Sequence, residues 1–117
     1  MGYGTFLFDG SARAYESLTT ATAVGFAPAK YALTSASDSF NPGGTIKAQA
    51  VLVTVEVADI RFTIDGSTPT TLATTAVGHQ ITAGQNYVIR GYDNIQRFLC
   101  INDVGSSGAI VHCTYFF

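Results

Sequence analysis

The chain has 117 residues, of which 47% are hydrophobic and only 12% are charged, which excludes an intrinsically disordered tail. Its net charge of −2 argues against nucleic acid as a partner, because nucleic-acid-binding domains carry a basic surface. No apolar run approaches the roughly 20 residues of a transmembrane helix, so we expect one soluble domain with no membrane partner.

The first 14 residues differ in composition and pattern from the rest of the chain. Tyr3, Phe6 and Phe8 lie among glycines without a clear periodicity, and we expect no secretion signal here because Met1 to Thr5 offers no basic region ahead of an apolar core. We expect residues 1–14 to form either an arm that docks its aromatic side chains on a neighbouring copy, or the first strand of the core. Residues 15–117 are expected to form the folded domain.

The rest of the chain predicts strands. Thr, Val, Ile, Tyr and Phe dominate the apolar stretches, and no window sustains the spacing of an amphipathic helix. Turn-forming residues separate these stretches, among them Asp65-Gly66, Gly84 and Gly105 to Gly108. The predicted strands are Ser17–Thr22, Lys47–Glu56, Ile60–Ile64, His79–Thr82, Tyr87–Gly91, Phe98–Ile101 and Ala109–Phe116. This succession predicts an all-β fold, a single antiparallel β-sandwich or jelly-roll-like domain with an N-terminal extended segment.

The last predicted strand is apolar on both faces. One face carries Ala109, Val111, Cys113 and Tyr115, and the other carries Ile110, His112, Thr114 and Phe116. Such a strand either lies between two layers or has its outer face covered by another subunit, and we favour the second because the chain is short for three layers. The expected interface residues are Tyr3, Phe6, Phe8, Ile110, Phe116 and Phe117.

The two cysteines fall on the last two predicted strands. We expect Phe98–Ile101 and Ala109–Phe116 to form a hairpin through Gly105–Gly108, with Cys100 and Cys113 facing the core. The absence of a CxxC spacing argues against zinc binding or redox function. Buried free thiols are therefore expected, with a disulfide between the two cysteines as the alternative.

No pattern in the sequence predicts catalysis or cofactor binding. His79 and His112 lie on different predicted strands, and neither has a second metal ligand at a suitable spacing. Neither a phosphate-binding glycine loop nor a GxSxG elbow occurs. The candidate carboxylates, which stand at strand ends where aspartate caps turns, are Asp59, Asp65, Asp93 and Asp103. We expect neither an enzyme nor a metal or cofactor site.

Short motifs in a fixed order carry a family resemblance. They are Leu18-Thr19, Ala23-Val24-Gly25-Phe26, Ile60 to Thr70 with its loop Asp65-Gly66-Ser67-Thr68-Pro69-Thr70, Gly78-His79, Ala83-Gly84, Ile95 with Phe98 and Ile101, and Thr114-Tyr115-Phe116. Over roughly residues 15–117 the chain resembles a group of small virion proteins of tailed bacteriophages. The loop from Asp65 to Thr70 alone also resembles a loop in β-sandwich modules attached to bacterial glycoside hydrolases.

The resemblance implies a small β-sandwich or jelly-roll subunit on a virus particle, and members of the group with an assigned role include capsid decoration, or cement, proteins. We therefore expect a virion protein, assembled in the host cytoplasm, that binds the major capsid protein and stabilises the assembled head. It is also expected to bind copies of itself, with a trimer favoured over a dimer. The alternative is a receptor- or carbohydrate-binding module on a tail or fibre, with Tyr3, Tyr87 and Tyr92 as candidate contacts.

Overall fold

The computed structural model describes residues 11–34, 45–70, 76–103 and 107–117. It is 53% strand and 11% helix, and its sheets are antiparallel, so the prediction of an all-β fold is confirmed. The elements of the described residues are β1 (Ala12–Thr19), β2 (Val24–Gly25), α1 (Pro28–Tyr31), β3 (Ala32–Thr34), β4 (Thr45–Lys47), β5 (Ala50–Glu56), β6 (Ile60–Thr63), β7 (His79–Ile81), β8 (Asn86–Arg90), α2 (Tyr92–Arg97), β9 (Leu99–Asn102) and β10 (Ile110–Phe116).

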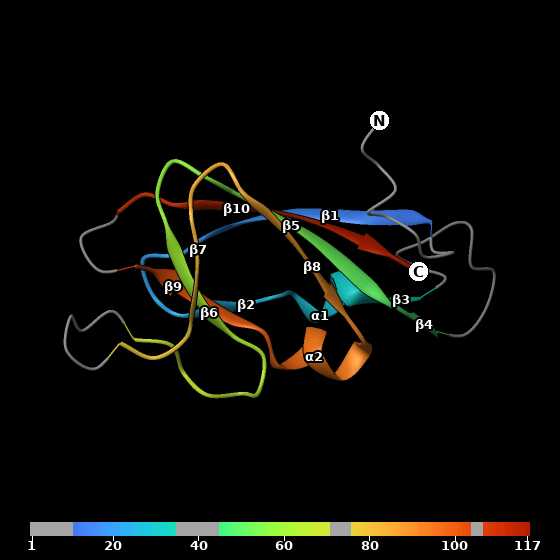
Figure 1. Cartoon of the computed structure of the whole chain (residues 1–117). Helices are drawn as coiled ribbons and strands as arrows, with labels where there is room; N and C mark the ends of the chain where they lie inside the picture. Colours follow the sequence, from blue (N-terminus) through green and yellow to red (C-terminus); the bar gives the residue numbers. More distant parts are fainter. Residues whose placement is uncertain (1–10, 35–44, 71–75, 104–106) are drawn as a thin grey trace.

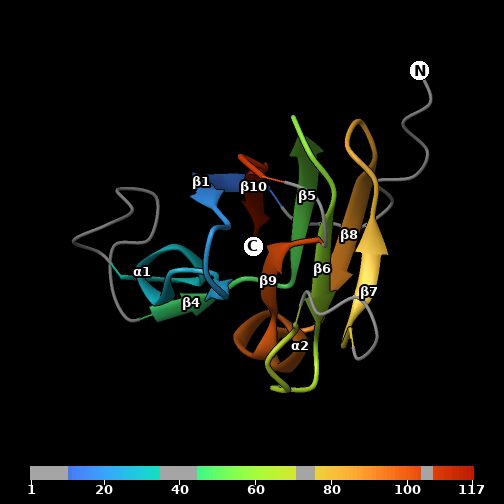
Figure 2. The same ribbon diagram turned by 90° about the vertical axis from the view of Figure 1, so that its left-hand side faces the viewer.

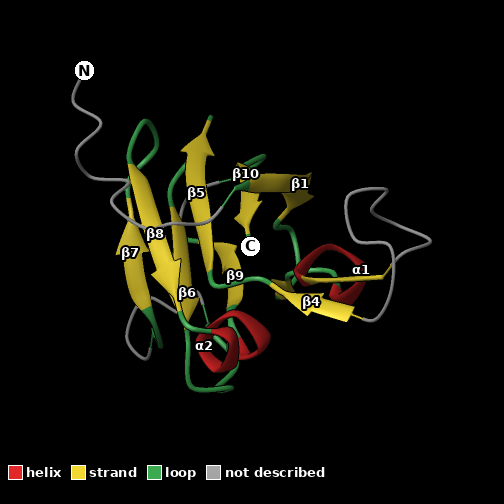
Figure 3. Cartoon of the chain, turned by 90° about the vertical axis from the view of Figure 1, so that its right-hand side faces the viewer, coloured by secondary structure: helices red, strands yellow, loops and turns green. Residues whose placement is uncertain are grey.

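Two four-stranded sheets make up the sandwich (Figure 1). The strand orders are β1-β10-β5-β8 in one sheet and β2-β9-β6-β7 in the other, while β3 and β4 form a separate two-stranded ribbon. Strands that follow one another along the chain therefore change sheet repeatedly. Figures 2 and 3 show β7 and β8 side by side, so the edge strands of the two sheets lie on the same side of the molecule.

The core lies between the two sheets and consists of the side chains that alternate inward. Val111, Cys113 and Tyr115 of β10 are fully buried, as are Val53 and Val55 of the neighbouring β5. Branched and aromatic side chains fit a pleated surface, and burying each one stabilises the fold by about 1.5–3 kcal/mol.

Aromatic rings join the two sheets across this core. The ring of Phe26 stacks on that of Phe98 with centroids 4.2 Å apart, and it meets the ring of Tyr115 edge-on at 5.6 Å. Glu16 of β1 points inward and accepts hydrogen bonds from the Tyr115 hydroxyl and, at 3.0 Å, from the backbone N–H of Ala27. The polar atoms that enter the core are therefore paired, as burial requires.

The expected hairpin between the last two strands is wrong. β9 pairs with β2 and β6 in one sheet, whereas β10 pairs with β1 and β5 in the other. Cys100 and Cys113 nevertheless both face the core, because inward alternation depends on each strand alone and not on which strands pair. Both are free thiols, as expected.

The connection from β9 to β10 crosses from one sheet to the other, and a polar contact holds its ends. The Thr20 hydroxyl, 1% exposed, donates to Asn102 Oδ1 at 2.5 Å, and the N–H of Ala109 donates to the same oxygen at 3.3 Å. Asn102 thus ties the end of β9 to the segments that follow β1 and precede β10.

Strand β1 begins at Ala12, earlier than the predicted start at Ser17. Small and charged residues dominate its first part and give no strand signal, but the pairing with β10 extends it. Ser11 and Phe117 exchange backbone hydrogen bonds of 3.1 and 3.0 Å. The expected boundary after residue 14 thus falls inside β1. Residues 1–10 lie outside the described residues, so the arm stays a prediction.

The helix α2 differs from the prediction, whereas the turn glycines agree with it. α2 was not expected; it begins after Gly91, which has φ 92°, and Ile95 anchors it in the core. The predicted turn glycines Gly66, Gly84 and Gly108 have φ values of 89°, 91° and 75°. A glycine is favoured at such values because it has no Cβ to clash.

Candidate interaction surfaces

The sheet β1-β10-β5-β8 turns one side to the core and the other to solvent. Residues directly opposite each other on antiparallel strands share a face, so register and alternation define its solvent side. We call this side the outer face. It consists of Ala12, Tyr15, Ser17 and Thr19 of β1, Ile110, His112, Thr114 and Phe116 of β10, Leu52, Thr54 and Glu56 of β5 with the buried Ala50, and Asn86, Val88 and Arg90 of β8.

A line of hydrogen bonds crosses three strands of the outer face. The imidazole of His112 is 2.9 Å from Glu56 Oε1 through Nε2 and 2.5 Å from the Tyr15 hydroxyl through Nδ1. Since an ionised carboxylate can only accept, Nε2 donates to Glu56; Nδ1 accepts from the Tyr15 hydroxyl when the ring is neutral and donates to it when the ring is protonated. The polar groups at the centre of the face thus satisfy one another.

Apolar side chains surround this line. Leu52, Val88, Ile110 and Phe116 are each partly exposed, and the Tyr15 side chain is 52% exposed. Serine and threonine hydroxyls occupy most of the remaining positions, and the charged side chains of the face are Glu56 and Arg90. Interface cores have this composition: depleted in charge and containing aromatic residues.

The expected interface residues fall into three groups. Ile110 and Phe116 lie on the outer face, where alternation placed them. Phe117 instead packs partly buried against the core. Tyr3, Phe6 and Phe8 lie outside the described residues. Sequence reasoning missed Tyr15 because its strand was expected to begin two residues later, and an earlier start would have revealed it.

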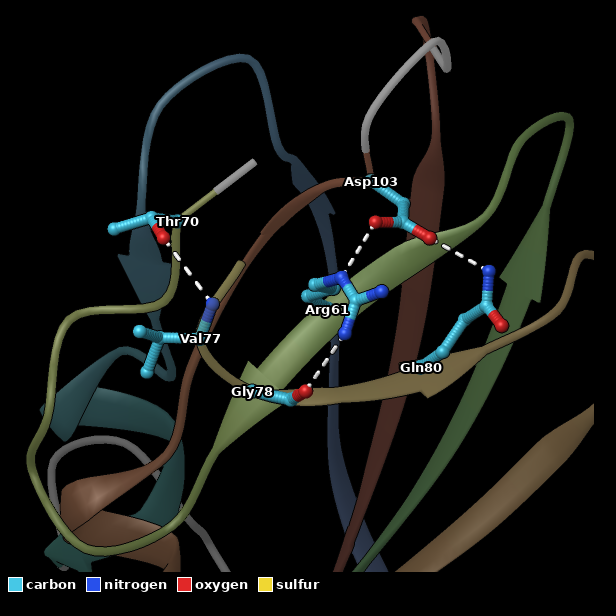
Figure 4. Close-up of polar contacts among 6 residues, drawn as sticks. All are labelled: Arg61, Thr70, Val77, Gly78, Gln80 and Asp103. Atoms are coloured by element: carbon cyan, nitrogen blue, oxygen red, sulfur yellow. Dashed lines mark hydrogen bonds and ion pairs between the residues drawn. The ribbon is translucent and has the colours of Figure 1, made fainter. Parts of the chain in front are cut away.

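A second polar cluster links the other sheet to its loops (Figure 4). Arg61 of β6 donates from Nε to Asp103 Oδ1 at 2.6 Å and from Nη1 to the carbonyl oxygen of Gly78 at 2.9 Å. Gln80 of β7 donates from Nε2 to Asp103 Oδ2 at 2.6 Å. The Asp103 side chain is 4% exposed and that of Arg61 is 24% exposed. This ion pair fixes the order β9-β6-β7 at its loop end.

Two of the candidate carboxylates cap turns, as expected. Asp59 Oδ1 accepts from the N–H of Ala83 at 2.8 Å, and Asp65 Oδ1 accepts from the N–H of Ser67 at 2.9 Å. The bond from Ser67 lowers the pKa of Asp65, so this carboxylate is ionised at neutral pH. Within the described ranges, no three His, Cys, Asp or Glu residues gather in a way that could hold a metal ion.

The buried thiols of Cys100 and Cys113 and the buried phenol of Tyr115 are not ionised at physiological pH. Burial raises the pKa of Cys100 to about 12. Burial first, then the nearby Glu16 carboxylate, raises the pKa of Cys113; burial and the hydrogen bond to Glu16 raise that of Tyr115. All three groups are therefore neutral at physiological pH, and a neutral thiol is a poor nucleophile.

The two sheet edges on the β7–β8 side share an aromatic cluster. The ring of Phe62, buried in the core, lies 5.4 Å from the imidazole of His79 on β7 and 5.2 Å from the ring of Tyr87 on β8. His79 is exposed, and Tyr87 is 47% exposed. Tyr92 is placed differently, because its ring packs edge-on against Tyr31 at 5.7 Å.

Two open hollows flank this aromatic cluster. The first, of about 330 Å³, lies between the loop after β6 and the segment entering β7; its lining residues are Thr63, Ile64, Asp65, Ser67, Val77, Gly78 and His79. The second, of about 450 Å³, lies beside the turn between β7 and β8 and includes Tyr87.

Comparison with known proteins found no relative. No family model matches the chain, no curated protein matches it, and no solved structure matches it. In the part of the chain that the structure describes, no helix has the length and apolar character to span a membrane.

Proposed function

We propose that the chain is a structural protein of a tailed-bacteriophage virion, a capsid decoration or cement protein that binds the assembled head through the outer face. The observation that carries this proposal is the partly exposed apolar surface of Leu52, Val88, Ile110 and Phe116. This surface surrounds a line of polar side chains that hydrogen bond to one another. This surface is a place for a permanent partner.

The polar line lowers the cost of covering this face. Burying a polar group without a partner costs about 1–3 kcal/mol. Tyr15, His112 and Glu56 already hydrogen bond to one another, at 2.5 and 2.9 Å. A partner that displaces water from this face therefore removes apolar surface from solvent without leaving the donors of Tyr15 and His112 unpaired.

The strand order supports a virion subunit. Leaving out the β3–β4 ribbon, the eight other described strands give the sheet orders first-eighth-third-sixth and second-seventh-fourth-fifth. We propose that this is the order of a jelly roll, an architecture that viral capsid domains and lectins share. This argument rests on fold analogy, so it supports the proposal without identifying the partner.

The proposed role is mechanical rather than chemical. A protein that binds the assembled lattice, and not its dissociated subunits, stabilises the lattice in proportion to its occupancy. Its partners are the major capsid protein and copies of the chain itself, with a trimer favoured over a dimer. The free thiols of Cys100 and Cys113 agree with assembly in the reducing host cytoplasm.

The test uses particles from a phage in which the gene for the chain has been deleted. The purified chain is added back, and both its retention on sedimented particles and the temperature of capsid opening are measured. Tyr15→Ala is the test variant, because it removes an exposed ring and one hydrogen bond from the outer face. Tyr87→Ala is the matched control, since this tyrosine is similarly exposed but lies outside the outer face.

The wild-type chain and Tyr87→Ala are expected to bind and to raise the opening temperature. Retention of Tyr15→Ala should fall about tenfold, because an aromatic residue central to an interface typically contributes 1–2 kcal/mol or more. Particles that open at the same temperature with and without the chain would overturn the cement role. Equal retention of both variants would overturn the use of the outer face.

A further inference from the structure

The β7–β8 side of the sandwich has features that the outer face does not explain. His79 and Tyr87 come from different sheets, and both rest on the buried ring of Phe62. Their polar atoms, the imidazole nitrogens and the phenol hydroxyl, make no hydrogen bond to another described residue. The core thus holds two exposed rings in fixed positions with their polar groups available.

The hollow beside His79 adds polar groups from another element. Asp65 and Ser67 lie on its loop wall, and Val77 and Gly78 lie on the opposite wall. The Asp65 carboxylate accepts from the N–H and the hydroxyl of Ser67, but an ionised carboxylate has about four acceptor positions, so it keeps acceptor capacity. Arg61 fixes the opposite wall by binding the carbonyl oxygen of Gly78 at 2.9 Å. The hollow is therefore preformed, as small-ligand sites generally are.

The volume of the hollow and the charges around it restrict the class of ligand that it can bind. A volume of about 330 Å³ is at the small end of ligand sites and open at the surface, so it suits one unit of a chain. No lysine or arginine lines the hollow, and the Asp65 carboxylate disfavours an anion. Arg97 lies close enough to act on the charge of Asp65, so a strong preference for cations is not expected either. These arguments leave a neutral ligand, and hydroxyl groups on it would suit the acceptor oxygens of Asp65 and the imidazole of His79.

We propose that the hollow between the Asp65–Ser67 loop and His79, together with the ring of Tyr87, is a binding site for a neutral saccharide. One sugar unit sits in the hollow and donates hydroxyl hydrogens to Asp65, and His79 hydrogen bonds to a further hydroxyl. A neighbouring unit packs its apolar face on Tyr87, whose ring offers apolar area and a polar tip. The site is independent of the outer face and goes beyond the proposed capsid role.

The test is an NMR titration of the isotope-labelled full chain. Neutral trisaccharides of glucose, galactose, mannose and N-acetylglucosamine are added one at a time at millimolar concentration, and a trigalacturonate serves as the anionic comparison. At least one neutral trisaccharide is expected to shift the amide signals of Ser67, Gly78, His79 and Tyr87 in a saturable manner. The anionic trisaccharide should leave these signals in place.

Three variants distinguish a loss of saccharide binding from a loss of folding. Tyr87→Ala removes the stacking ring and should weaken binding about fivefold to tenfold. Asp65→Asn preserves the turn, because an amide oxygen can still accept from Ser67, but it removes the charged acceptor and should weaken binding about tenfold. Tyr15→Ala, on the outer face, should bind within twofold of the wild-type chain. Urea unfolding midpoints establish that each variant is folded.

The outcomes are distinguishable from those for the capsid role. The site is overturned if no neutral trisaccharide shifts these signals, if only the trigalacturonate does, or if Tyr87→Ala and Asp65→Asn bind as tightly as the wild-type chain. None of these outcomes affects the retention of the chain on particles, which depends on Tyr15. Conversely, loss of particle binding by Tyr15→Ala leaves the saccharide titration unchanged.

Discussion

The ion pair between Arg61 and Asp103 gives the sharpest prediction of stability. Arg61→Met removes the two hydrogen bonds to Asp103 Oδ1 and the Gly78 carbonyl oxygen while keeping the length and apolar stem of the side chain. The carboxylate of Asp103, 4% exposed, then keeps Gln80 as its neutral donor. The loss of the guanidinium charge beside a buried carboxylate is what makes this substitution costly.

The magnitude follows from the exposure of the two partners. Removing one member of a buried pair typically costs about 3–5 kcal/mol. Because Arg61 is 24% exposed and water screens part of the pair, we expect about 3 kcal/mol for Arg61→Met. Asp103→Leu should cost less, about 1–2 kcal/mol, because the guanidinium left behind can reach solvent. The double variant should cost about 1 kcal/mol, since a buried pair replaced by apolar residues is often nearly neutral.

Urea unfolding at pH 7, followed by circular dichroism, measures these differences. The slope of free energy against urea should be the same in all four proteins, so that midpoints report stability alone. Additive single costs would show that the two side chains do not interact energetically. A larger cost for Asp103→Leu than for Arg61→Met would refute the argument from exposure.

Three further predictions concern the backbone and the core. Val57 has φ 77° and is 70% exposed, so Val57→Gly should raise the free energy of unfolding by about 1 kcal/mol by relieving strain; a lower urea midpoint would contradict this. A Cβ at Gly78 would lie 2.9 Å from a carbonyl oxygen of β6, whereas one at Gly66 meets nothing within 4 Å. Gly78→Ala should therefore lower the thermal midpoint more than Gly66→Ala. Equal losses would contradict this, because they would show that the backbone near Gly78 can move away from β6 without a loss of stability. Burial holds the pKa of Cys100 at about 12 and raises that of Cys113 from the same ordinary value of 9.0. The unfolded chain therefore loses these protons first, so the free energy of unfolding should fall as pH rises from about 9 toward 12, by up to about 1.4 kcal/mol per pH unit for each thiol. Replacing both cysteines by alanine should remove the fall between about pH 9 and 10 and reduce it above pH 10, where the buried phenol of Tyr115 still contributes; an unchanged pH profile would mean that the thiols do not cause it.

Each of the seven predicted strands overlaps an observed one, but the short elements β2, α1, β3 and α2 were not predicted, and the strand pairing was predicted poorly. Alternation in β10 predicted which side chains face the core, because a strand's faces depend only on its own sequence. The choice of partner strand depends on contacts far apart in the chain, and nothing in the sequence near Cys100 and Cys113 indicated that their strands belong to different sheets. The expected hairpin failed for this reason.

The candidate surfaces show the same limit. Ile110 and Phe116 could be placed on a solvent side from alternation alone. The line of Tyr15, His112 and Glu56 could not, because its members are 97 and 56 residues apart and meet only through the register of β1, β10 and β5. The pairing of His79 with Tyr87 likewise needs both sheets in place.

Quantitative mass spectrometry of gradient-purified particles tests the central claim most directly. The particles come from the phage that encodes the chain, and the ratio of the chain to the major capsid protein is measured. A head decoration protein is expected at a fixed ratio close to one copy per capsid subunit or a simple fraction of it. Absence from purified particles, or only a few copies per particle, would contradict a role on the capsid lattice.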